Sequence, residues 1–118
     1  MAVAKNLEFY LTETWIMDVT CHDANNRPLN INNAVITFIL KDNMWNTMFT
    51  LNNASGVIVT NAVAGQCSVI ATPAIQNSAN IVDKTYKYEL QVVLGDGTVT
   101  TQCVGELDVN ASLFGNNN

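Results

Sequence analysis

The first residue to consider for catalysis in this chain is its single histidine. His22 is followed by Asp23, and a His-Asp pair supplies two members of a catalytic triad. Adjacent residues of a strand point to opposite faces, however, and no serine or cysteine lies in a recognisable nucleophile elbow. The pattern therefore favours a surface histidine at the end of a strand, and we expect no enzyme.

The acidic residues are scattered singly along the chain. Glycoside hydrolysis needs two carboxyl groups about 5 to 9 Å apart, and no spacing in the sequence proposes such a pair. The segment from Asp23 to Asn26 is rich in oxygen ligands, as a calcium loop is. It lacks the glycine at position six and the bidentate glutamate at position twelve of that loop. We therefore expect no catalytic residue, no metal ligand and no cofactor.

Cys21, Cys67 and Cys103 each fall on the inward phase of an expected strand. This favours three small buried thiols, and one disulfide with a leftover thiol is the alternative. No pair has the spacing of a metal site. Residues 1–5 have no basic segment followed by an apolar run, so we expect no export signal and maturation in a reducing cytoplasm. All three thiols are then expected to be free.

The two tryptophans are expected in different environments. Trp15 is in phase with Met17 and Val19, which places it in the core. Trp45 follows a turn in a weaker strand and is the better candidate for an exposed aromatic. An exposed aromatic can act as a platform for a sugar. Trp45 is thus the candidate ligand contact of an alternative function, a carbohydrate or host-surface binding module that uses end loops.

Composition narrows the class of partner. The chain has 118 residues, a hydrophobic content of 48%, a charged content of 13% and a net charge of −5. This length suits one domain, which we expect over residues 1–118, with an ordered body at about 7–109 and a polar tail at 110–118. The basic residues do not cluster, so neither nucleic acid nor a membrane surface is an expected partner. They are Lys5, Arg27, Lys41, Lys84 and Lys87.

A long hairpin organises the expected fold. Residues 86–94 and 98–109 alternate in polarity on either side of Gly95-Asp96-Gly97, which supplies the positive φ angles of a tight turn. On the second arm, alternation groups Val99 and Thr101 with Cys103 and Leu107 on the inward face. Shorter strands are expected at 7–11, 14–22, 34–41, 44–51, 57–60 and 66–71. Pro73 can begin a short helix through Asn77.

Seven or eight short antiparallel strands with turns between them predict an all-β sandwich, with a closed barrel as the alternative. The expected core consists of Trp15, Met17, Val19, Ile36, Phe38, Leu40, Val69, Tyr88, Leu90, Val92, Val99, Cys103 and Leu107. Apolar residues on outward phases, together with an apolar pair in the tail, are the expected assembly contacts. They are Val35, Ile39, Val93, Val104, Leu113 and Phe114. An edge strand is a further route to assembly.

Several segments together resemble a known group of proteins. They are 14–19 TWIMDV, 26–29 NRPL, 31–40 INNAVITFIL, 55–59 SGVIV, 65–69 GQCSV, 86–92 YKYELQV, 96–97 DG and 105–109 GELDV. This pattern resembles the small immunoglobulin-like β-sandwich modules of tailed-bacteriophage virions, among them the N-terminal domain of upper baseplate proteins. It covers about residues 7–109. In one departure from that pattern, we expect this chain to be the module alone, with no fibre or receptor-binding domain after it.

The resemblance implies a single immunoglobulin-like sandwich and a function without catalysis. The chain would be a structural protein of a phage particle, as a tail or baseplate component, a fibre-base adaptor or a capsid-surface protein. Its partners would be other virion proteins and copies of itself. Its location would be the virion, assembled in the cytoplasm of the bacterial host.

Overall fold

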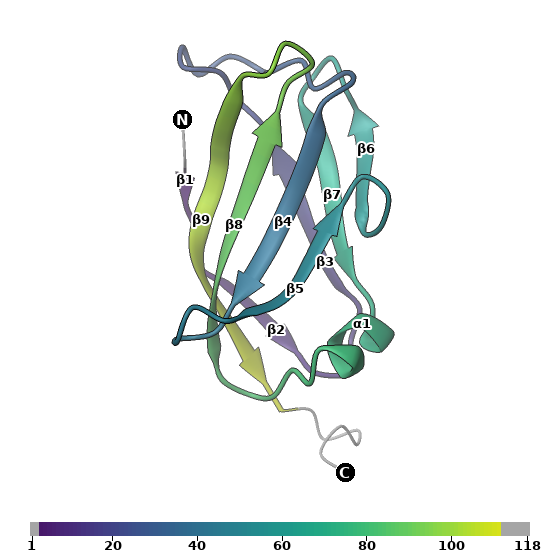
Figure 1. The fold of residues 1–118 in the computed structure, drawn as a ribbon, viewed down its shortest axis with the longest axis vertical. Coiled ribbons are helices and arrows are strands. Elements are labelled where there is room, and N and C mark those ends of the chain that lie inside the picture. The colour runs from purple at the N-terminus through teal and green to yellow at the C-terminus, as the bar shows by residue number, and fades with distance from the viewer. Residues whose placement is uncertain (1–2, 112–118) are drawn as a thin grey trace.

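The structure, a computed structural model, describes residues 3–111 as two stacked β-sheets (Figure 1). The large sheet has the order β1-β9-β8-β4-β5, and β2 also pairs with β9. Its strands are β1 (Val3–Ala4), β2 (Leu7–Tyr10), β4 (Val35–Lys41), β5 (Thr47–Asn52), β8 (Thr85–Val93) and β9 (Val99–Asn110). The small sheet has the order β3-β7-β6. Its strands are β3 (Trp15–Thr20), β7 (Gln66–Ala71) and β6 (Val57–Asn61). The predicted all-β sandwich is confirmed.

Strand pairing joins distant parts of the chain. β1 and β2 run parallel to β9, whereas the other paired strands are antiparallel. Tyr88 strengthens the parallel contact, because its hydroxyl donates a 2.6 Å hydrogen bond to the carbonyl oxygen of Lys5. Burial raises the pKa of Tyr88 to about 12. The N-terminal strands are therefore tied to the centre of the large sheet.

Alternating side chains fill the space between the sheets, as the period of a strand requires. In β3, Trp15, Met17 and Val19 are buried, and the residues between them are exposed. Most of the predicted core is buried as expected. These residues are Trp15, Met17, Val19, Ile36, Phe38, Leu40, Val69, Tyr88, Leu90, Val92 and Leu107.

Two residues of the predicted core lie elsewhere. Val99 is 57% exposed, which makes its assignment to the core wrong, and Cys103 is only half-buried. The cause is a β-bulge: Leu90 pairs with Cys103, but the next residue of β8, Gln91, pairs with Thr101. The extra residue of β9 shifts the alternation by one, so Val99 and Thr101 face outward.

The extra residue is Gln102, which turns into the core and is 3% exposed. Its side-chain oxygen accepts a 2.9 Å hydrogen bond from the backbone N–H of His22. Its side-chain nitrogen donates to the backbone carbonyl of His22 at 3.1 Å. The same nitrogen donates to the Thr100 hydroxyl at 2.9 Å. These bonds satisfy the buried amide and tie β9 to the end of β3.

Tyr86 anchors the start of β8. It is completely buried, and its hydroxyl donates to the Val82 carbonyl at 3.1 Å and accepts from the Val82 N–H at 3.0 Å. A tyrosine bonded to the backbone just upstream is the tyrosine corner of immunoglobulin-type sandwiches. It fixes the point at which the chain enters the long hairpin.

The helix expected after Pro73 is present as α1 (Pro73–Ser78). Its cap is Thr72, whose side chain accepts a hydrogen bond from Ile75 N–H. Gln76 is buried and donates to the carbonyl oxygens of Glu13 at 2.7 Å and Ala71 at 3.2 Å. The helix thus closes one end of the sandwich (Figure 1). No helix within residues 3–111 is long and apolar enough to cross a membrane.

Cys21 and Cys67 are buried as expected, and Cys103 packs against the edge of the core. A hydrogen bond with the Cys67 thiol, together with burial, raises the pKa of Cys21. Burial also raises the pKa of Cys103. All three are thiols in the structure, and the absence of a disulfide in the isolated protein stays a prediction.

Candidate functional site

The outer face of the large sheet is built from side chains that the ladder places in rows. Each row takes one outward residue from β4, one from β8 and one from β9. In order along β4 the rows are Val35-Val93-Val99, Thr37-Gln91-Thr101, Ile39-Glu89-Val104 and Lys41-Lys87-Glu106. Directly opposed residues of neighbouring strands have Cβ atoms about 4.5 to 5.5 Å apart, so the members of a row touch.

The first row, Val35-Val93-Val99, is a contiguous apolar strip that we call the valine row. Val35 is 55% exposed, Val99 is 57% exposed, and Val93 between them is half-buried. Single exposed valines are normal on a protein surface, but contiguous ones mark interaction sites. The bulge at Gln102 creates this row, because without it Val99 would face the core.

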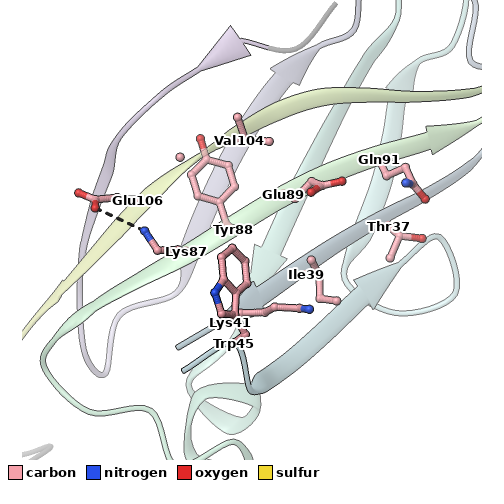
Figure 2. Close-up of a pocket in the computed structure, with 11 residues that line it drawn as sticks. Thr37, Ile39, Lys41, Trp45, Lys87, Tyr88, Glu89, Gln91, Val104 and Glu106 are labelled. Carbon is pink, nitrogen blue, oxygen red and sulfur yellow. Dashed lines mark ion pairs between the residues drawn. The ribbon is translucent and has the colours of Figure 1, made fainter. Parts of the chain in front are cut away.

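The residues of the other three rows, except Thr101, line a groove of about 530 Å³, within the range of about 300 to 1,000 Å³ typical of small-molecule sites. Figure 2 shows Thr37 and Gln91 toward one end of this groove and Trp45 beside Lys41 farther along. Its labelled lining residues are Thr37, Ile39, Lys41, Trp45, Lys87, Tyr88, Glu89, Gln91, Val104 and Glu106.

Charges in the groove are balanced. Lys41 and Lys87 supply two positive charges, and Glu89 and Glu106 supply two negative ones. Lys87 Nζ lies 3.8 Å from Glu106 Oε2, as the dashed line in Figure 2 marks. The groove therefore carries no net charge, although the whole chain has a net charge of −5.

A tight turn holds Trp45 beside the groove. The Asp42 carboxylate accepts hydrogen bonds from the N–H groups of Met44 and Asn46, both at 2.9 Å, and from the Asn46 side chain at 3.2 Å. The backbone N–H of Trp45 donates a hydrogen bond to the backbone carbonyl of Asp42 at 3.1 Å. Hydrogen bonding, chiefly from the Asn46 backbone, lowers the pKa of Asp42.

Within this turn Trp45 has φ +65°, which is uncommon for a bulky residue. Trp45 is 66% exposed as a residue, and Lys41 Nζ lies 5.8 Å from the centroid of its ring. The strand expected at 44–51 begins only at Thr47 for this reason. The turn thus presents a large aromatic surface to solvent at a fixed place.

The structure brings most of the predicted site residues to this one face. Val35, Ile39, Val93 and Val104 all lie on the outer side of the large sheet, and Trp45 borders the same surface. Ile39, Val93 and Val104 are half-buried rather than exposed. Leu113 and Phe114 lie outside the described residues.

The His22-Asp23 pair has a structural explanation. His22 is half-buried and forms a β-bridge with Pro28. The Asp23 carboxylate accepts hydrogen bonds from the N–H groups of Arg27 at 3.0 Å and Asn25 at 2.9 Å, and these bonds lower its pKa. Between residues 3 and 111, no group of three His, Cys, Asp or Glu side chains is arranged to hold a metal.

A second apolar patch, which the sequence did not predict, lies on the outer face of the small sheet. Ile16 is 55% exposed and pairs with the half-buried Ile70, and Ile58 is 54% exposed on the neighbouring strand. Ile58 pairs with Ser68, two residues from Ile70. The outward phase of Ile16 was visible in the sequence, but its neighbours come from strands far along the chain.

Comparison with known proteins bears on the fold. No protein-family model and no curated protein matches the chain. Among solved structures, CopC from Methylosinus trichosporium OB3b is similar, with 9% identity, 92% of this chain and 89% of that chain covered, and a TM-score of 0.50. Murine CRIg is 12% identical, with 89% and 92% covered and a TM-score of 0.45. The chain is an immunoglobulin-like β-sandwich, as the sequence predicted.

Proposed function

We propose that this chain is a non-enzymatic structural module of a bacteriophage particle that acts by protein–protein contact through the outer face of its large sheet. Its partners are other virion proteins or copies of itself, and it resides in the virion. The resemblance of its sequence segments to phage modules motivates the particle. The valine row is the single observation that carries the contact.

The valine row offers a partner a contiguous apolar surface. Val35 and Val99 are largely exposed and flank Val93 in a strip three strands wide. Burying one valine completely contributes about 1.5 to 3 kcal/mol. Valine side chains are stiff at χ1, so they lose little freedom when a partner covers them. A flat apolar strip of this kind suits a strand or sheet of a second protein.

Open strand edges supply a second route to contact. β5 and β6 each end the order of their sheets, and neither contains a charged residue or a proline. Natural edge strands are usually protected by lysine, proline or a bulge. Each of these two has a bulge, at the Leu40/Lys41 step opposite β5 and after Val59 in β6, which shortens the regular edge. The sheet face is therefore the larger surface, and the edges can extend it.

The experiment for this proposal locates the chain and its contacts together. Particles are purified from infected cells, cross-linked and analysed by mass spectrometry. The proposal expects peptides of this chain in the particles, with cross-links from Lys41 and Lys87, which lie on the outer face of the large sheet. Cross-links from Lys84 alone, which lies outside the rows, or absence of the chain from particles would contradict it.

A further inference from the structure

We propose that the groove beside Trp45 binds a neutral oligosaccharide, with one sugar ring on the indole. This inference does not rest on assembly. The groove begins at Thr37, in the row next to the valine row, but its far end at Lys41 is six residues of β4 from Val35, which is about 20 Å in a strand. Trp45, at that far end, and Val35 can therefore be altered separately.

The exposed indole provides the first half of the recognition. Trp45 is 66% exposed, whereas Trp15, the other tryptophan, is 3% exposed in the core. Exposing a large aromatic surface is costly, because such side chains bury about 150 to 250 Å² when they are covered. The C–H groups on one face of a sugar ring form a flat apolar surface that covers an indole. The Asp42 turn fixes the backbone that carries the indole.

Hydrogen-bonding side chains provide the second half. Thr37, Lys87, Glu89 and Gln91 line the groove and are half-buried, so they project from a rigid sheet. Figure 2 shows Thr37 and Gln91 close together and Glu89 between them and Lys87. A hydroxyl, an ammonium, a carboxylate and an amide together offer both donors and acceptors. Sugar hydroxyls, which donate and accept at once, match such a set. Glu89 is oriented by the Thr101 hydroxyl, which donates to it at 3.3 Å.

Charge and length define the ligand further. The two lysines and two glutamates cancel, so the groove does not favour an anion such as a phosphate or an acidic sugar. The lining residues of β4 run from Thr37 to Lys41, a span of about 13 Å along the strand. That span exceeds a single sugar ring, which makes the ligand an oligosaccharide.

The test uses a panel of neutral hexose and N-acetylhexosamine mono- and trisaccharides, titrated into the labelled protein and followed by two-dimensional NMR. The proposal expects shifts at the Trp45 indole N–H and the Gln91 side-chain amide. Trp45→Asn, which tolerates the left-handed turn, should weaken binding of both sizes by about tenfold or more. Gln91→Met, similar in volume, should weaken only the trisaccharide.

Met44→Ala is the matched control, because Met44 lies in the same turn, is 80% exposed and does not line the groove. It should leave binding unchanged, as should Val35→Thr. The proposal is wrong if no member of the panel shifts the Trp45 resonance, or if Met44→Ala weakens binding as much as Trp45→Asn. It is also wrong if only acidic forms of the same sugars bind. Each of these results leaves the assembly proposal standing.

Discussion

Val99 lies directly opposite Val93 in the ladder between β8 and β9, although simple alternation along β9 places Val99 in the core. The two face each other on the outside because Gln102 occupies a bulge and turns inward. One buried amide thus determines which side chains at the turn end of β9 face solvent. The surface proposed for assembly depends on it.

Replacing Gln102 by leucine should destabilise the protein. The substitution leaves the N–H and carbonyl of His22 without the partners they have at 2.9 and 3.1 Å. An unsatisfied buried group costs about 1 to 3 kcal/mol, and urea denaturation measures the loss. Val99→Thr, at an exposed outward position of the same strand, is the control and should stay within about 0.5 kcal/mol of the parent. Equal stability of Gln102→Leu and the parent would show that these bonds do not hold β9 in place.

Truncating an inward-facing residue of the hairpin should lower the stability of the protein much more than truncating an outward-facing one. Leu90 is completely buried, and Leu90→Ala should lower the free energy of unfolding by about 2 to 5 kcal/mol. Val99 is 57% exposed, and Val99→Ala should change it by less than about 1 kcal/mol. Chemical denaturation of both variants decides the matter. A loss below about 0.5 kcal/mol for Leu90→Ala would mean that the faces are reversed.

Local sequence predicted several elements of the fold but not the bulge in the hairpin. Alternation in β3, the turn at Asp96-Gly97 and the helix after Pro73 follow from neighbouring residues, and all three are present. The bulge was missed because Thr101 and Gln102 are both polar, so alternation alone does not show which of them is extra. Packing of the Gln102 amide on His22, eighty residues away, makes that choice.

The candidate site was only partly predictable for the same reason. Outward phases in β4 and β8 identified Val35, Ile39 and Val93 from the sequence. Their grouping into rows depends on register between strands, which no local pattern contains. Trp45 was expected to be exposed, but its left-handed φ was not, since tryptophan has no preference for that conformation.

The turn that presents Trp45 should loosen in acid. Hydrogen bonds, chiefly from the Asn46 backbone, lower the pKa of Asp42 below its ordinary value of 3.8. A depressed pKa means that the stabilisation is fully present above 3.8 and is lost as the pH falls through the pKa of the folded state. Fluorescence of the exposed Trp45 should therefore shift below pH 3.8, while Trp15 stays buried.

Asp42→Asn isolates the contribution of the carboxylate, because the amide keeps an acceptor oxygen but does not titrate in this range. The acid shift in Trp45 fluorescence should disappear in this variant. Asp96→Asn alters a similar turn far from Trp45 and should leave the shift in place. A shift that persists in Asp42→Asn would have another origin.

Assembly through the valine row is tested by the double variant Val35→Thr/Val99→Thr, which removes both of its exposed valines. Threonine keeps the β-branched shape, so the fold should persist while the apolar strip is lost. The measurement is the amount of each variant incorporated into purified particles, with Ile16→Thr on the opposite face as the control. We expect incorporation of the double variant to drop by about tenfold or more, corresponding to ~1.4 kcal/mol, and that of Ile16→Thr to stay unchanged. Incorporation of the double variant at the parental level, with its fold intact, would contradict it.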